Sequence, residues 1–205
     1  METGKNNHAA SVVSLRPTTL KFSFNPKKST QAAALLLSLN GGDMDKYLWI
    51  KMLYWADREA IAKWQEPITG DVPVSAPYGQ ILGTIYDLTK GDCQTLRQYW
   101  EQFISDADTE TNRITLKSEP GVNELSKAEI AILKATHAKF KDFTFERTKN
   151  FFAALAEHEN VAKGTSKPLP MESIFRAVGK SDADIKKAEE RCRQTKLAEL
   201  LLGRA

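Results

Sequence analysis

The sequence has few of the residues that build metal sites, disulfide scaffolds or membrane spans. Its 205 residues include 2 cysteines and 3 histidines. Cys93 and Cys192 are too far apart in the sequence for the paired spacing of a zinc site. Two cysteines are also too few for a disulfide scaffold. No segment approaches the roughly 18 to 20 continuous apolar residues that cross a bilayer. We therefore expect an unprocessed, soluble protein of the cytoplasm, with no membrane partner, no metal and no cofactor.

The sequence also lacks an excess of charge of one sign. Its 29 basic and 26 acidic residues leave a net charge of +3, and the lysines are scattered and form no basic stripe of the kind that binds phosphate backbones. Nucleic acid is therefore not expected as a partner. A nucleotide-binding loop, a metal-ligand spacing and a nucleophile elbow are missing as well. We assign no catalytic residue and do not expect an enzyme.

What the sequence does contain is a succession of helical patterns with few strand signals. Periodicity and capping residues predict helices over residues 29–39, 45–65, 81–89, 92–104, 126–140 and 144–158, a short one from Pro170 to Gly179, and a last one from residue 181. Short strands are predicted over residues 19–24 and 114–116, with an edge strand or hairpin arm at 72–74. The fold class is mainly α, a single globular helical domain of about seven to eight helices with a few short strands or a small hairpin.

Composition divides the chain into three parts. Residues 1–17 mix small polar residues without a period and are predicted to be a flexible leader. Residues 18–180 form the helical domain. Residues 181–205 form a C-terminal helix that packs on this domain or on a partner, since it turns from charged to apolar near its end. Apolar residues at a chain end are rarely ordered unless docked, so Leu197, Leu200 and Leu201 are candidate partner contacts, and dimerisation would explain them too.

The centre of the sequence is the helix over residues 45–65, which carries Asp57. This residue is flanked along the helix by Ile50, Leu53 and Ile61, so we expect it to be at least half buried. A buried carboxylate needs hydrogen-bond partners. Backbone N–H groups of the turn at residues 69–71 or an arginine would serve, and a structural link between loop and helix is favoured over a catalytic acid.

Arg58 follows Asp57 and has two open interpretations. It can stack on an aromatic ring of Tyr54 or Trp55, or it can pair with Glu59 or Asp71 at the surface. We expect Arg58 and Lys51 to share an exposed face, and this face is a second candidate for partner binding.

The loop after this helix adds Gly70, Tyr78 and Gly79. The glycines are expected to supply backbone angles that other residues avoid. Tyr78 is either a partner contact or a loop anchor. Of the histidines, His137 is expected in the core with a hydrogen bond, and His158 is expected to offset a helix dipole.

The runs at residues 50–59, 67–71, 78–79 and 85–91 together resemble the Panacea domain. This family includes SocA-type antitoxins and phage-associated domains. The resemblance covers residues 24–178, although Gln80 stands where the family usually has proline and residues 160–162 lack the usual aromatic after His158-Glu159. The residues that carry it are Asp57, Arg58, Glu59, Thr69, Gly70, Asp71, Tyr78, Gly79, Tyr86 and His158.

The resemblance implies a mainly helical antitoxin that neutralises a cognate protein toxin by direct binding and performs no chemistry. Two alternatives stay open. Asp57, Asp71 and His158 could form the site of an enzyme or of a ligand-binding protein if the fold brought them together. A DNA-binding autoregulator is the other, although the sequence shows no basic recognition helix.

Overall fold

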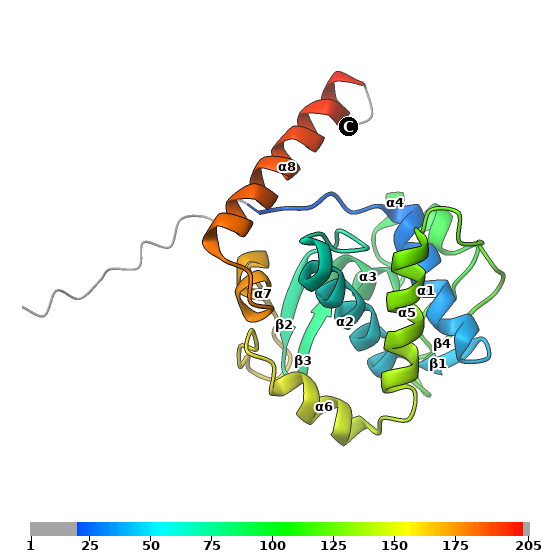
Figure 1. Ribbon diagram of the computed structural model, residues 1–205. Helices are drawn as coiled ribbons and strands as arrows, with labels where there is room; N and C mark the ends of the chain where they lie inside the picture. Colours follow the sequence, from blue (N-terminus) through cyan, green and yellow to red (C-terminus); the bar gives the residue numbers. More distant parts are fainter. Residues whose placement is uncertain (1–19, 203–205) are drawn as a thin grey trace, which may run out of the picture.

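A computed structural model describes residues 20–202, and in it a long central helix, α2 (Lys46–Trp64), runs through the middle of the fold (Figure 1). The helices α1 (Pro26–Leu39) and α5 (Lys127–Phe140) pack beside it, and α6 (Phe145–Ala153) and α7 (Met171–Ala177) also contact it. Every residue of α2 from position 48 to position 57 is buried. A helix that is buried all round is a core element and has no solvent-exposed face along that stretch.

The ends of the helices follow the capping residues in the sequence. The side chain of Asp45 accepts a hydrogen bond from the Leu48 N–H at 3.0 Å and starts α2. Ser126 opens α5, and Ser181 opens α8 (Asp182–Leu201), each through a reciprocal capping box. The predicted starts of these three helices are therefore confirmed.

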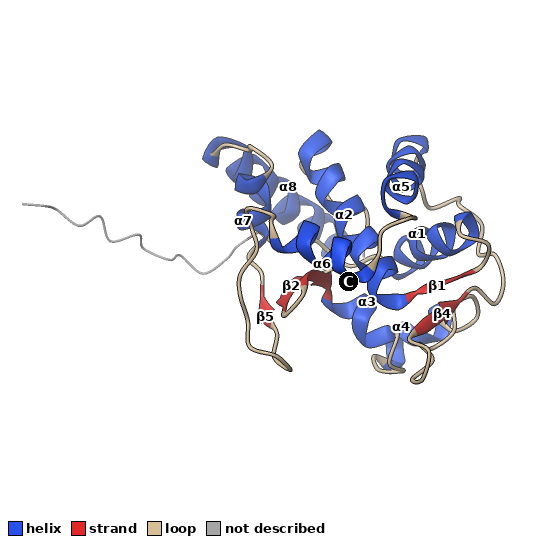
Figure 2. Cartoon of the chain, turned by 90° about the horizontal axis from the view of Figure 1, so that it is seen from below, coloured by secondary structure: helices blue, strands red, loops and turns tan. Residues whose placement is uncertain are grey.

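Two small antiparallel sheets complete the fold (Figure 2). In one, β2 (Pro73–Ala76) forms a hairpin with β3 (Gly79–Leu82) and also pairs with β5 (Lys167–Pro168). In the other, β1 (Asp43–Asp45) pairs with β4 (Arg113–Thr115). The predicted hairpin arm at residues 72–74 and the predicted strand at residues 114–116 are both present. Mainly α is the correct fold class, with eight helices in the described residues.

One predicted strand is wrong. Residues 20–25 are in no strand, while Thr19 and the predicted leader lie outside the described residues. Burial does alternate along the segment, from buried Leu20 through half-buried Phe22 and Phe24. Alternation reports which side chains face the core, whereas a strand also needs a neighbouring backbone to pair with.

Six predicted helix ends, in five helices, are also wrong. The helix predicted from residue 81 begins later, as α3 (Gly83–Leu88), because residues 79–82 pair with β2. The helix over residues 92–104 shortens to α4 (Gln94–Trp100), and α6 ends at Ala153 and not near residue 158. The helix predicted from residue 29 begins at Pro26, since Asn25 caps it, and Pro170 is a cap residue and not the first helical one.

The last helix, α8, projects away from the rest of the molecule (Figure 1). Ile185 and Ala188 in its first half are buried, and Gln65 of the loop after α2 bonds Asp184 and Arg191. Near its end, Glu199 accepts the Ser23 hydroxyl at 3.5 Å, while Leu197, Leu200, Leu201 and Leu202 are exposed. Among residues 20–202, none of the helices has both the length and the apolar content needed to cross a membrane.

Candidate functional site

Asp57 joins α2 to the loop that follows it. Its side chain is 5% exposed. One carboxylate oxygen accepts the N–H groups of Ile68 at 2.9 Å and Thr69 at 3.0 Å, and the other accepts the Thr69 hydroxyl. The Thr69 N–H belongs to the turn at residues 69–71 that the sequence indicated, whereas Ile68 directly precedes that turn and the Thr69 hydroxyl is a side-chain donor. The carboxylate therefore fixes the loop to the central helix.

The Asp71 carboxylate fixes the same loop at a second point, further along the sequence. Its carboxylate accepts the N–H groups of Val72 at 2.6 Å, Thr84 at 3.0 Å and Ile85 at 2.9 Å. The last two belong to the first turn of α3, where N–H groups have no partner within the helix. Asp71 therefore caps a helix that begins twelve residues later, and it ties the hairpin β2–β3 into a closed unit.

Gly70, between these two carboxylates, packs against the segment that precedes α1. Its φ is +69°, and a Cβ atom on it would overlap the carbonyl group of Ser23. The neighbouring Thr69 carbonyl accepts the N–H of Asn25 at 3.1 Å. Glycine is required here both for the backbone angle and for the close approach of the two backbone segments.

The third member of the predicted carboxylate–histidine site lies apart. The His158 ring contacts Asn160, with 3.3 Å between Nε2 and Oδ1, and none of its described contacts reaches Asp57 or Asp71. The space beside the two carboxylates is about 10 Å³, which is no larger than a water molecule needs. Residues 20–202 contain no cluster of metal-ligating side chains. The geometry thus gives this corner a structural role.

Burial makes the stability of this corner sensitive to pH. Burial, outweighing the hydrogen bonds from Thr69 and aided by Asp71, raises the pKa of Asp57 from 3.8 to about 7. The folded state thus holds a proton at pH values where the unfolded state has lost it, so the contribution of Asp57 favours folding below about pH 4 and is lost as the pH rises through 7. Asp57→Asn removes this titration.

We expect wild type to lose a few kcal/mol of unfolding free energy relative to Asp57→Asn between pH 4 and pH 8. Urea unfolding of the two proteins over this range measures the difference. Asp71, whose pKa burial also raises, is present in both proteins, so the two pH profiles differ by the titration of Asp57 and its repulsion with Asp71. Parallel pH profiles for the two proteins would show that Asp57 titrates as an ordinary carboxylate.

Arg58 pairs with a residue that the sequence did not indicate. Its Nε donates to Glu157 at 2.6 Å, and the Tyr54 hydroxyl donates to the same oxygen at 2.8 Å. The Arg58 side chain is 13% exposed and that of Glu157 is 0% exposed, so the predicted surface pair with Glu59 or Asp71 is wrong. The predicted stacking is present, with the guanidinium 5.2 Å from the ring centroid of Trp55.

Sequence patterns gave no signal for Glu157 beyond its position next to the His158-Glu159 pair. Burial and the Glu157 charge both raise the pKa of the Tyr54 hydroxyl, which keeps it a donor. Because α6 ends at Ala153, the chain after it turns inward and brings Glu157 against α2. Glu59, one residue past Arg58, is half buried.

Lys51 is buried, which overturns its predicted exposure. It is 1% exposed, and its Nζ donates to the Gln80 carbonyl at 2.8 Å. Burial lowers the pKa of this amine well below its ordinary value. Lys51 lies on the side of α2 that faces β3, and β3 is distant from it in the sequence. Lys51 is therefore removed from the candidate partner contacts, and no exposed Lys51/Arg58 face exists.

The Tyr78-Gly79 turn covers Lys51. Gly79 has a φ of +97°, and a Cβ atom there would lie 2.8 Å from Cβ of Phe152 and 3.1 Å from the Lys51 Nζ. The Tyr78 carbonyl accepts the Tyr47 hydroxyl at 3.0 Å, while its ring is 39% exposed. Tyr78 thus anchors the loop through its backbone and leaves its ring available to a partner.

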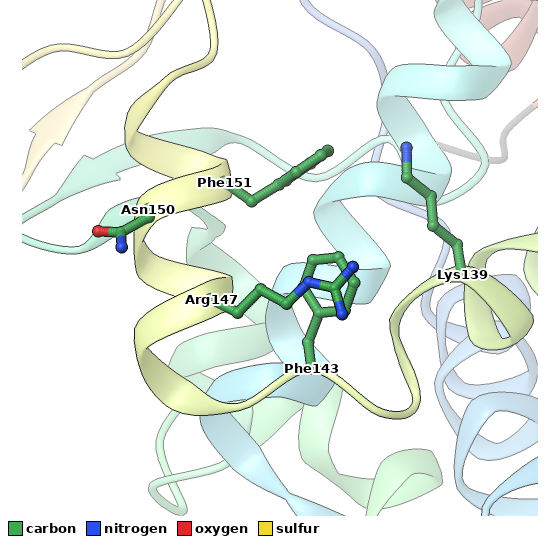
Figure 3. Close-up of a pocket in the computed structure, with 5 residues that line it drawn as sticks. All are labelled: Lys139, Phe143, Arg147, Asn150 and Phe151. Atoms are coloured by element: carbon green, nitrogen blue, oxygen red, sulfur yellow. The ribbon is translucent and has the colours of Figure 1, made fainter.

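A second surface feature lies between α5 and α6 (Figure 3). Lys139 from α5 and Arg147 from α6 border a hollow that also includes Phe143, Asn150 and Phe151. The Arg147 guanidinium lies 3.9 Å from the ring centroid of Phe143, and the Lys139 Nζ lies 3.8 Å from that of Trp55. This cationic and aromatic surface adjoins Arg58, and the sequence analysis did not identify it.

Comparison with known families shows which family the chain belongs to. The family model described as antitoxin SocA-like, Panacea domain, matches residues 50–154. The chain belongs to this family of SocA-like antitoxins. The Panacea match includes Asp57, Asp71, the Tyr78-Gly79 turn and Tyr86, whereas Glu157 and α8 lie beyond it. No curated protein and no solved structure matches the chain.

Proposed function

We propose that this Panacea-domain protein is a cytoplasmic antitoxin that neutralises a cognate protein toxin by direct binding, as one half of a phage-associated toxin–antitoxin pair. The observation that carries the proposal is the family match over residues 50–154. The site geometry supports binding over chemistry. Asp57 and Asp71 each accept three hydrogen bonds from the protein itself, so neither is poised to act on a substrate.

The end of α8 is the first candidate contact surface for the toxin. Leu197, Leu200 and Leu201 are 58%, 58% and 78% exposed. They continue a helix whose first half is held by the buried Ile185 and Ala188. The leucines are therefore presented on an element that is fixed at its base. Covering them would remove apolar surface from water, at about 25 cal/mol per Å².

Two further surfaces complete the candidate interface. The exposed ring of Tyr78 lies on the hairpin turn. Arg58 keeps one edge exposed beside the hollow of Lys139 and Arg147. Arginine and aromatic residues carry much of the binding energy in protein interfaces. The leucines and the Tyr78 ring are already exposed, so neither surface must open before a partner can bind.

The deciding experiment expresses the protein encoded by the adjacent gene in a susceptible host, alone and together with this chain. We expect growth arrest when the neighbour is expressed alone, normal growth when both are present, and co-purification of the two proteins as one complex. A toxic neighbour that this chain neither relieves nor binds would contradict direct neutralisation.

The same complex tests the leucine surface. We expect the triple variant Leu197→Ser, Leu200→Ser, Leu201→Ser to bind the toxin at least about tenfold more weakly, which is about 1.4 kcal/mol. Its thermal midpoint should be unchanged because the leucines are exposed. Val122→Ser, which alters an apolar side chain that is 42% exposed elsewhere on the molecule, is the matched control.

Calorimetric titration of the toxin into each variant measures the effect. An unchanged dissociation constant for the triple variant would remove the C-terminal leucines from the interface. A second copy of the chain is the alternative occupant of this surface. In that case wild type alone would elute as a dimer and the triple variant as a monomer.

A further inference from the structure

A cavity of about 650 Å³ lies beside the β2–β3 hairpin. Its walls come from the first half of α2, from α3, from the start of α6 and from the loop before β5. Cavities that bind small molecules are typically about 300 to 1,000 Å³. Of the residues proposed to contact the toxin, Tyr78 alone lines this cavity.

One end of the cavity is basic. The Nζ atoms of Lys46 and Lys90 lie 5.7 Å and 4.2 Å from the ring centroid of Tyr86. Lys90 is paired with Asp87 at 3.1 Å, whereas Lys46 has no ion pair within residues 20–202. Burial lowers the pKa of Lys46, the nearby Lys90 charge lowers it further, and the Asp45 charge offsets part of this effect. Lys46 is therefore held near a second cation, with no ion pair of its own among the described residues.

The inner wall adds a third amine. Lys51 lines the cavity, and although its Nζ can carry three hydrogens, Gln80 is its one hydrogen-bond acceptor among the described residues. Its other neighbours are the rings of Tyr47 and Phe152, with centroids 5.4 Å and 5.5 Å away. A buried amine with free hydrogens at the wall of a cavity is suited to an anionic ligand.

The mouth of the cavity is aromatic. The ring of Phe145 lies 4.8 Å from that of Tyr47 and 5.8 Å from that of Tyr78, centroid to centroid. Phe145 is 50% exposed and Tyr78 is 39% exposed. Exposed rings grouped at the entrance of a cavity offer a stacking surface to a planar ligand.

We propose that this cavity binds a small phosphate monoester that carries a planar ring, of the size of a nucleoside monophosphate. The phosphate lies at Lys46 and Lys90, and the ring lies against Tyr78 and Phe145. A phosphate monoester carries a charge of about −1.5 to −2 at pH 7, which supplies a counter-charge to Lys46, the lysine that Asp87 does not pair. This site goes beyond the proposed toxin binding and does not depend on it.

Calorimetric titration of the full chain with AMP tests the site, with adenosine and inorganic phosphate as separate probes. We expect saturable binding of AMP at one site and binding at least about tenfold weaker for each of the other two probes. The double variant Lys46→Gln, Lys90→Gln should weaken AMP binding at least about tenfold, because charge-assisted hydrogen bonds are lost. Lys134→Gln, a change of an exposed lysine on α5, should leave it unchanged.

A second double variant tests the binding of the ring independently of the binding of the phosphate. Tyr78→Ser with Phe145→Ser should weaken AMP binding and leave the binding of inorganic phosphate as it is in wild type. Absence of saturable AMP binding would overturn the proposal. So would wild-type affinity in the lysine variant, or equal affinity for AMP and inorganic phosphate.

Discussion

Replacing Gly70 by alanine is expected to lower the free energy of unfolding by on the order of 4 kcal/mol. The new methyl group would overlap the Ser23 carbonyl oxygen and lie 2.8 Å from the carbonyl carbon. The left-handed backbone angle adds a cost of about 1 to 2 kcal/mol, and overpacking typically costs about 1 to 3 kcal/mol. The obstacle is backbone, so no side-chain rotation relieves it.

Moving the Ser23 segment away would break the bond from the Asn25 N–H to the Thr69 carbonyl. That bond joins the start of α1 to the loop that Asp57 holds. Chemical denaturation of the purified variant measures the loss. We expect the midpoint to fall with little change in the slope against denaturant, since the folded state keeps its compactness.

Gly179→Ala is the matched control for this change. Gly179 has a φ of +79°, and a Cβ atom there would have nothing within 4 Å. The control variant therefore has the unfavourable backbone angle without any steric overlap. We expect it to lose about 1 to 2 kcal/mol of unfolding free energy. Equal losses in the two variants would mean that the approach of Ser23 is not a constraint.

The second large effect is expected for Glu157→Ala, with a loss of about 3 to 5 kcal/mol of unfolding free energy. The change removes the acceptor of both the Tyr54 hydroxyl and the Arg58 guanidinium. Tyr54 is 1% exposed and cannot turn to water. A buried charge and a buried hydroxyl would both be left without a partner.

Two comparisons make this prediction specific. Glu157→Gln keeps the size and one acceptor oxygen, so its loss should lie between wild type and alanine. Glu159→Ala breaks the exposed ion pair with Lys167, whose side chain is 63% exposed, and should cost less than about 1 kcal/mol. Thermal and urea unfolding of the three variants measure the order. A Glu157→Ala protein as stable as Glu159→Ala would contradict the buried network.

Both predictions concern residues that fix loops against α2 and so position the proposed binding surfaces. Gly70 and Asp57 hold the loop against α2, and Glu157 fixes the chain after α6 against the same helix. The Tyr78 ring and the mouth of the cavity depend on these anchors for their positions. Variants at Gly70, Asp57 and Glu157 should therefore lower the stability of the protein and weaken partner binding only as a consequence of that loss. The leucine variants should weaken partner binding and leave the stability unchanged.

Much of the site could be predicted where the signal was local. The burial of Asp57 followed from its apolar neighbours on one helix, and its partners followed because a buried carboxylate needs donors and the nearest were eleven and twelve residues away. The stacking of Arg58 on Trp55 followed from their spacing of three residues on a helix. Such arguments need only the geometry of one element and its adjoining loop.

Other residues could not be placed in this way. Lys51 had the same apparent exposure as Arg58 on a helical wheel, yet a hairpin thirty residues later covers it. Glu157 meets Arg58 across 99 residues of sequence. Of the two lysines at Tyr86, Lys46 is the first residue of α2, and Lys90 lies in the turn after α3. No pattern within one segment contains information on which segments will become neighbours.

The sequence by itself determined the mainly α class, the capped starts of α2, α5 and α8, the link from Asp57 to its loop and the family resemblance. It could do so because capping, periodicity and motif spacing depend on residues within a few turns of one another. The tertiary structure alone decided that residues 79–82 are a strand, that Lys51 is buried, that Glu157 holds Arg58 and that a basic, aromatic cavity exists. These features arise only when distant segments pack together and desolvate one another's polar groups.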